Sequence, residues 1–227
     1  MRMNLKRVLF LIFSLFIFCL ILGCKPAEID NDNTEKGVAT SNQKSKYIIK
    51  FENVKVDDHF DHNRLWAEDF EGNVIKEDIE ADIPRPIKNI YQRDFDGDGH
   101  DDLLIATEPY ENGLFFDFGV FTLDKNFNAT EVFYGDGSIS HCDYWFLTDD
   151  NKLIHMNSIR NYENEDNAVY KSRYTCALYT PKKEKGELVF ESGKVIKTKY
   201  ELDNLKEIRD ALGIPENAIV ISNITVE

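Results

Sequence analysis

The chain has 227 residues, of which 42% are hydrophobic and 30% charged, and a formal net charge of −14. A surface this acidic repels phosphate backbones, so the composition argues against a nucleic-acid partner. It favours a cationic protein or a divalent cation as partner, although charge alone does not distinguish these from simple solubility.

Residues 1–23 have the layout of a secretory signal peptide. Three basic residues precede an apolar run, Val8–Leu22, that is short for a membrane span. The stretch Leu20–Cys24 resembles the lipobox of bacterial lipoproteins, with Leu22 bulkier than the residue usual at that place. This resemblance implies cleavage before Cys24 and acylation of its thiol. The alternative is an uncleaved anchor helix, and both interpretations place a tethered protein on the far side of a membrane.

Residues 24–46 comprise the lipidated cysteine and a segment with almost no large apolar side chain, which predicts a disordered tether. Lys25 stands where an aspartate would resemble the inner-membrane retention signal of enteric lipoproteins. We therefore expect the outer membrane, on its periplasmic or its surface face. Cleavage removes three basic residues, which leaves 24 Lys and Arg against 41 Asp and Glu, a net charge of −17.

The mature chain keeps Cys142 and Cys176, an even pair in an oxidising compartment, which predicts a disulfide. The bridge would close a loop of about 35 residues and stabilise the fold by about 4 kcal/mol in the chain-entropy model. The alternative is two buried thiols.

Residues 47–227 have the length of one domain and read mostly as strands. Residues 47–56 alternate in polarity, residues 71–73 are typical of a hairpin turn, and residues 113–124 form an aromatic strand. One helix is predicted where apolar residues recur in a stripe before Gly213 and Pro215 (Leu202, Leu205, Ile208 and Leu212), with Asp203 as its cap. The pattern indicates a mainly β class: an antiparallel sheet, a sandwich or a partial propeller-like domain with one helix in the C-terminal region.

An acidic loop interrupts this pattern between two predicted strands. Counted from Asp94, carboxylates occupy positions 1, 3, 5 and 9, a glycine occupies position 6, and a backbone carbonyl is available at position 7 (Asp94, Asp96, Asp98, Asp102, Gly99 and His100). Calcium prefers six to eight oxygen ligands, and alternate side chains of a tight loop converge on one point. The pattern therefore predicts a Ca²⁺ site, with an ion-free acidic turn as the alternative.

This predicted site is not an EF-hand, because Ile105 occupies position 12 and both flanks are β-like. We expect a structural ion, bound with a dissociation constant in the extracellular range of about 10⁻⁴ to 10⁻³ M.

The stretch "DFDGDGHDDLLI" resembles the calcium loop of the FG-GAP and VCBS repeat family, D-x-D-G-D-G-x-x-D-[LI]. The match covers about a dozen residues, and residues 134–144 echo it only weakly. In that family the repeats build β-propellers, whereas this chain has one good copy. Single copies also occur in small bacterial envelope lipoproteins, some of which resemble calcium-dependent lysozyme inhibitors and immunity proteins.

These observations predict a lipid-anchored envelope binding module that recognises a protein partner. The sharper hypothesis is inhibition of a cationic, lysozyme-like peptidoglycan hydrolase. The alternatives are an envelope hydrolase that uses carboxylate chemistry and a surface lipoprotein for adhesion or substrate capture. No common catalytic motif is present, and no residue is singled out as catalytic. The cluster His59, Asp61 and His62 favours a polar loop over a zinc site, and His155 favours packing.

Overall fold

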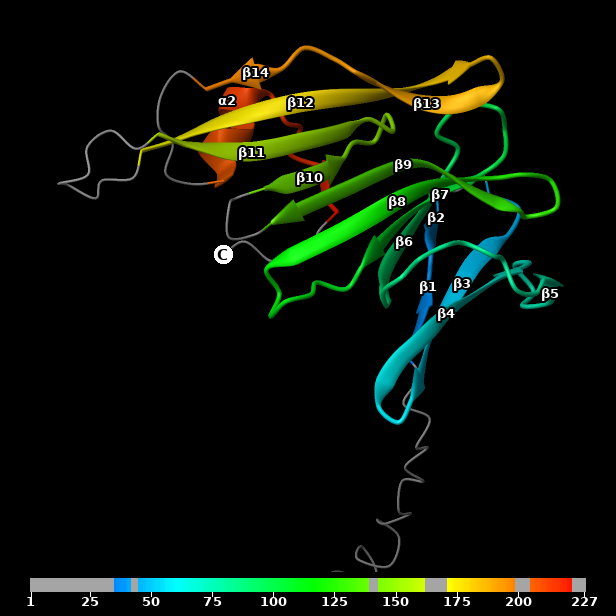
Figure 1. Cartoon of the computed structure of the whole chain (residues 1–227). Coiled ribbons are helices and arrows are strands. Elements are labelled where there is room, and N and C mark those ends of the chain that lie inside the picture. Colours follow the sequence, from blue (N-terminus) through cyan, green and yellow to red (C-terminus); the bar gives the residue numbers. More distant parts are fainter. Residues whose placement is uncertain (1–34, 42–44, 139–142, 162–170, 199–204, 222–227) are drawn as a thin grey trace, which may run out of the picture. The chain divides into compact units, whose positions relative to one another are not determined.

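The computed structural model describes residues 35–41, 45–138, 143–161, 171–198 and 205–221. Within these ranges the chain forms three β-sheets and one α-helix, as Figure 1 shows, which confirms the predicted mainly β class. None of the helical structure in these ranges is long and apolar enough to cross a lipid bilayer.

The N-terminal sheet has the strand order β1-β3-β4-β5. Its bounds are Glu35–Val38 for β1, Ile48–Val56 for β3, His59–Glu68 for β4 and Val74–Lys76 for β5. Alternation along β3 buries Ile49 and Phe51, so one face of the sheet packs on the core. The predicted hairpin turn is confirmed between β4 and β5. The Asp69 carboxylate fixes it by accepting the backbone N–H groups of Glu71 and Asn73.

The central sheet has the strand order β2-β6-β7-β8-β9. Its bounds are Thr40–Ser41 for β2, Ile87–Arg93 for β6, Asp102–Thr107 for β7, Phe115–Leu123 for β8 and Ala129–Ser138 for β9. Both faces are covered, so β7 is a continuous buried run rather than an alternating one. Leu103 and Ile105 pack in a cluster with the N-terminal sheet, whereas Leu104 and Ala106 pack in a cluster with the C-terminal sheet.

The C-terminal sheet has the strand order β13-β12-β11-β10-β15, with β14 paired to β12. Its bounds are Tyr144–Leu147 for β10, Leu153–Asn161 for β11, Lys171–Glu184 for β12, Glu187–Ser192 for β13, Ile196–Lys197 for β14 and Ile219–Val220 for β15.

Helix α2, Leu205–Leu212, covers the face of this sheet that points away from the central sheet. Ile208 and Leu212 make the contact, and Gly213 ends the helix with a φ of +70°. The predicted helix and its stop are confirmed, while Leu202 and Asp203 lie outside the described residues.

The folded unit begins earlier than the sequence predicts. Strands β1 and β2 come from the segment expected to be a disordered tether, so that expectation is wrong for residues 35–41. Ala39, which lies between the two strands, is 6% exposed and donates its N–H to the Ile49 carbonyl at 2.8 Å. A polar segment can form edge strands because the ladder bonds come from the backbone, which every residue shares.

Two runs of four consecutive antiparallel strands, β6–β9 and β10–β13, pack face to face through a cluster that includes Phe118, Trp145 and Leu153. Propeller blades have this form, but a propeller needs about four to eight of them. The described residues supply three sheets, so the arrangement is at most partially propeller-like.

Candidate metal centre

The acidic loop joins β6 to β7 across a tight corner. Arg93 and Asp102 are paired in the ladder, so residues 94–101 form the connection between two antiparallel strands. Gly97 and Gly99 have φ angles of +76° and +86°, which only glycine adopts without strain. The chain therefore adopts the predicted strand-loop-strand corner between β6 and β7.

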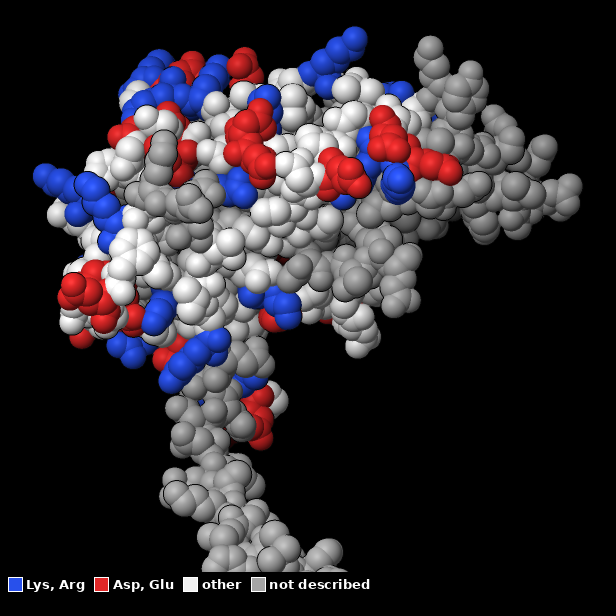
Figure 2. Space-filling model, turned by 180° about the vertical axis from the view of Figure 1, so that it is seen from behind, with Lys and Arg blue, Asp and Glu red and all other residues white. Residues whose placement is uncertain are grey.

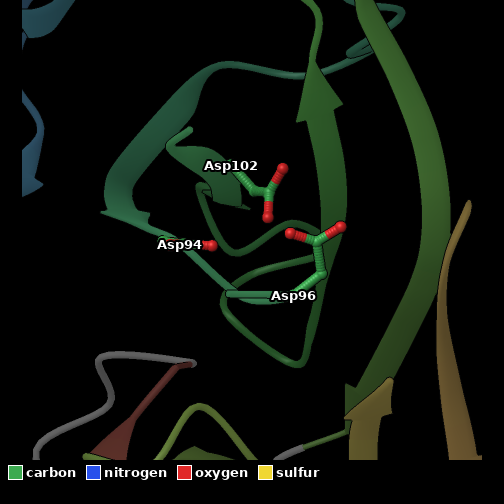
Figure 3. A group of neighbouring side chains, drawn as sticks. All are labelled: Asp94, Asp96 and Asp102. Carbon is green, nitrogen blue, oxygen red and sulfur yellow. The ribbon is translucent and has the colours of Figure 1, made fainter. Parts of the chain in front are cut away.

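Three of the predicted ligands converge in this corner. Asp94, Asp96 and Asp102 each direct one carboxylate oxygen to a common point, and these oxygens lie within 4.8 Å of one another (Figure 3). Calcium–oxygen distances are about 2.3–2.6 Å, so two ligands on opposite sides of one ion lie at most about 5 Å apart. The three oxygens thus have a spacing that a single Ca²⁺ could span.

The loop holds these side chains through its own backbone. Asp94 accepts the N–H groups of Gly97, Asp98 and Gly99 at 2.7, 3.1 and 2.9 Å. Asp96 accepts the N–H of Asp98 at 3.0 Å. Two carboxylates are therefore oriented before any ion binds, which lowers the entropic cost of assembling a site.

Asp98 is not part of the converging group. Its Oδ1 accepts the N–H of His100 at 2.8 Å, and its Oδ2 lies 3.2 Å from the ammonium of Lys183. The same ammonium lies 3.1 Å from Asp96. Burial alone would raise the pKa of Asp98, but the His100 N–H and Lys183 outweigh it and lower the pKa. Lys183 of β12 is thus an intramolecular cation at the edge of the loop, and sequence reasoning missed it.

The other loop residues divide between the site and the surroundings. Asp101 accepts a hydrogen bond from the side-chain N–H of Gln92 at 2.9 Å. His100 is exposed, and the ligand atom predicted for it is its backbone carbonyl oxygen.

Asp102 is the buried member of the group, at 4% exposure. Burial and the charges of the neighbouring aspartates together raise the pKa of its carboxyl to about 7, against the opposing effect of the Phe95 N–H, 3.0 Å away. A carboxylate with a raised pKa gains from a cation, because the ion supplies the counter-charge that water cannot.

The corner is also anchored to the C-terminal sheet. Arg93 donates to the Thr148 carbonyl at 2.8 Å, and Asn151 donates to the Asp94 carbonyl at 2.7 Å. Thr148 and Asn151 belong to the turn between β10 and β11. Together with Lys183, these contacts connect the loop to two hairpins far away in sequence, which no local pattern could reveal.

A groove of about 490 Å³ opens beside the loop. Asp96, Asp98 and Asp102 line it together with Glu131 of β9, Lys183 and Glu187 of β13. Burial raises the pKa of Glu131, and the nearby charge of Asp82 adds to this. The loop thus presents its carboxylates to a polar groove rather than to a closed cavity.

The remaining predicted site residues are dispersed or lie outside the described residues. His59, Asp61 and His62 lie at the start of β4, so the predicted polar loop is a strand there, and His62 pairs with Asp61 at 2.7 Å. His155 is half-buried, pairs with Asp143 and stacks on Trp145 at 4.3 Å, which agrees with a packing role.

The cysteine predictions remain untested. Cys24 and Cys142 both lie outside the described residues, whereas Cys176 is buried on β12 and forms no disulfide with any described residue. Tyr144, two residues after Cys142, stands two strands away from Cys176 by ladder register, about 10 Å at the usual spacing. A disulfide between the two cysteines stays a prediction.

No protein-family model, no curated protein and no solved structure matches the chain. The class of protein therefore rests on the fold and on the acidic corner.

Proposed function

We propose that this chain is a lipid-anchored envelope binding module with one structural calcium site and that it recognises a protein partner. The observation that carries the proposal is that three carboxylate oxygens, one each from Asp94, Asp96 and the buried Asp102, lie within 4.8 Å of one another. Mutual repulsion disfavours such an arrangement unless protons or a cation balance it.

Asp94, Asp96 and Asp102 would hold the ion, and Asp98 and the carbonyl of His100 are the further ligands that the resemblance to the FG-GAP and VCBS calcium loops implies. Asp98 would join by exchanging Lys183 for the ion. When bound, calcium would pin the β6–β7 corner, and with it the contacts from Arg93 and Asn151 to the neighbouring sheet.

Calorimetry tests the metal site. The full chain should bind Ca²⁺ with a dissociation constant of about 10⁻⁴ to 10⁻³ M, and its melting temperature should fall when a chelator is added. Asp96→Asn should abolish both effects. Asp101→Asn makes the same charge change in the same loop, on the side that contacts Gln92, and should leave both intact. Absence of heat and of a melting shift in the unmodified chain would refute calcium binding.

The partner proposal is supported by the acidic mature chain and by the absence of a common catalytic motif. Inhibition of a cationic lysozyme-like hydrolase is its sharper form, because electrostatic attraction accelerates the encounter of an acidic and a basic surface. A pull-down with lysozymes and muramidases, with and without calcium, tests it. Failure to retain any of them would remove the inhibitor proposal and leave the calcium site standing.

The lipid anchor is proposed from the resemblance of Leu20–Cys24 to a lipobox. Cys24→Ser should abolish incorporation of labelled fatty acid in cells and release the protein from the membrane fraction. Persistent labelling would place the anchor elsewhere.

A hydrolase is the second candidate, because Glu131, with its raised pKa, shares the groove beside the loop with Glu187. Two carboxyl side chains that flank the scissile bond are the groups that most glycoside hydrolases use. Clearing of a peptidoglycan suspension by the full chain, and loss of clearing in Glu131→Gln, would favour this candidate over the binding module.

A further inference from the structure

The hairpin between β4 and β5 exposes an unusual amount of apolar surface. Phe70, Val74 and Ile75 are 65%, 49% and 48% exposed and lie within six residues of one another. Single exposed apolar residues are common, but a group of them marks a contact surface.

Strand β5 is the last strand of the N-terminal sheet. In the described part of the chain no strand pairs with its outer edge. An open edge presents unpaired N–H and C=O groups, to which an extended segment of another protein can add as a further strand.

The chain runs from β5 directly into the wall of a groove of about 560 Å³. Residues 62–65 of β4 line one side, and residues 78–82 line the other. Asp78 pairs with Arg64 at 3.3 Å, whereas no described cation pairs with Glu80 or Asp82. The groove therefore carries negative charge that no described cation neutralises at Glu80 or Asp82.

The sign of the charge selects the occupant. Residues 68–82 contain seven acidic side chains and one lysine (Glu68, Asp69, Glu71, Glu77, Asp78, Glu80, Asp82 and Lys76). Figure 2 shows acidic and basic groups interspersed over much of the face that it draws. A second copy of the chain would bring the same charge and be repelled. A segment that alternates basic and apolar residues would match both the acids and the exposed apolar side chains.

We infer that the open edge of β5 and the acidic groove beside it form the docking surface for a basic, extended segment of a partner protein. This inference rests on the proposed recognition of a protein and assigns it to one edge of the N-terminal sheet. The partner strand would pair with β5, cover Val74 or Ile75 with its apolar side chains and place lysines or arginines near Glu80 and Asp82.

A fluorescent peptide of alternating lysine and valine is the probe, and anisotropy with the full chain is the measurement. Glu80→Lys/Asp82→Lys should weaken binding roughly tenfold or more, because two attractive charges become repulsive. The matched control Glu184→Lys/Glu191→Lys changes the net charge equally on β12 and β13 and should stay within about twofold of the unmodified chain. All four acids are exposed, and melting curves would confirm that each variant is folded.

Equal weakening by both double variants would overturn the inference, because binding would then follow net charge alone. No binding of the peptide by the unmodified chain would also overturn it, while the lysozyme pull-down decides separately whether the chain recognises a protein. A dimer in sedimentation that Ile75→Lys dissociates would overturn it in favour of a second copy as occupant.

Discussion

Asp102 shows at the level of a single residue why the acidic corner depends on its ionic surroundings. It begins a core strand and is 4% exposed, yet it faces other carboxylates. Its neighbour Asp98 is closer to solvent and has a lysine beside it. Their pKa values are therefore shifted in opposite directions: that of Asp102 is raised and that of Asp98 is lowered.

The first prediction concerns pH. Because the pKa of Asp102 is about 7 in the native state, against 3.8 ordinarily, the native state holds this proton more tightly than the unfolded state does. The contribution of Asp102 to the free energy of unfolding therefore falls as pH rises from about 4 to about 7 in chelator, and is constant above that range. Asp102→Asn should remove this slope, and saturating Ca²⁺ should reduce it in the unmodified chain. Denaturant unfolding at several pH values measures it; an unchanged slope in the variant would contradict the assignment.

The second prediction concerns Lys183. Its ammonium occupies the edge of the loop between Asp96 and Asp98, and it competes with an added cation for both. Lys183→Met should raise calcium affinity a few-fold in calorimetry at low salt and less at high salt, where screening already weakens the ion pair. Lys182→Met is the matched control, since Lys182 pairs with Glu184 and Glu191 instead. Equal affinities in the two variants would show that Lys183 does not compete.

At the level of elements, strands β8 and β9 are fitted to each other by glycine and phenylalanine. Gly135 and Gly137 stand opposite Phe118 and Phe116 in the ladder, and a Cβ on either glycine would lie about 2.4–2.6 Å from the facing ring. The weak echo of the acidic loop at residues 134–144 is therefore, as far as the structure describes it, a strand whose glycines make room for aromatic rings.

The third prediction follows from this contact. Gly135→Ala should destabilise the protein by about 1–3 kcal/mol, because the buried Phe118 ring must move within a packed core. Combining it with Phe118→Leu should cost less than the sum of the two changes, since the smaller side chain leaves space for the methyl group. Strict additivity in denaturant unfolding would show that the ring is not what limits residue 135.

At the level of the whole molecule, the central sheet packs one face on the N-terminal sheet and the other face on the C-terminal sheet. The central sheet is buried on both sides, and the acidic corner at the end of β6 is bonded to the C-terminal sheet through Arg93 and Asn151. Loss of either outer sheet would expose a complete apolar face of β7. The domain should therefore unfold cooperatively.

The fourth prediction tests where this domain begins. A chain that starts at residue 46 lacks β1 and β2, one at an edge of the N-terminal sheet and one at an edge of the central sheet. It should melt at a lower temperature than a chain that starts at residue 34, because the ladder bonds and the buried Ala39 are lost. A tether would have no such effect, so equal melting temperatures would restore the sequence-based boundary.

Much of the fold and part of the site could be read from the sequence. The hairpin at residues 71–73, the aromatic strand β8 and helix α2 each have a local pattern, and the loop spacing predicted Asp94, Asp96 and Asp102. Local patterns did not predict β1 and β2, whose strand character comes only from the partners they join. They also did not predict the ion pair of Asp98 with Lys183, because spacing carries no information about a residue 85 positions away.

The sequence by itself determined a β-rich chain with one acidic, glycine-kinked corner, because strand alternation, turn chemistry and the period of a helix are all local properties. Only the tertiary structure decided which carboxylates converge, which one pairs with a lysine, and which strand edge stays open. Those outcomes depend on what lies opposite each side chain after distant strands have paired, and burial by those strands sets both the pKa of Asp102 and the exposure of β5.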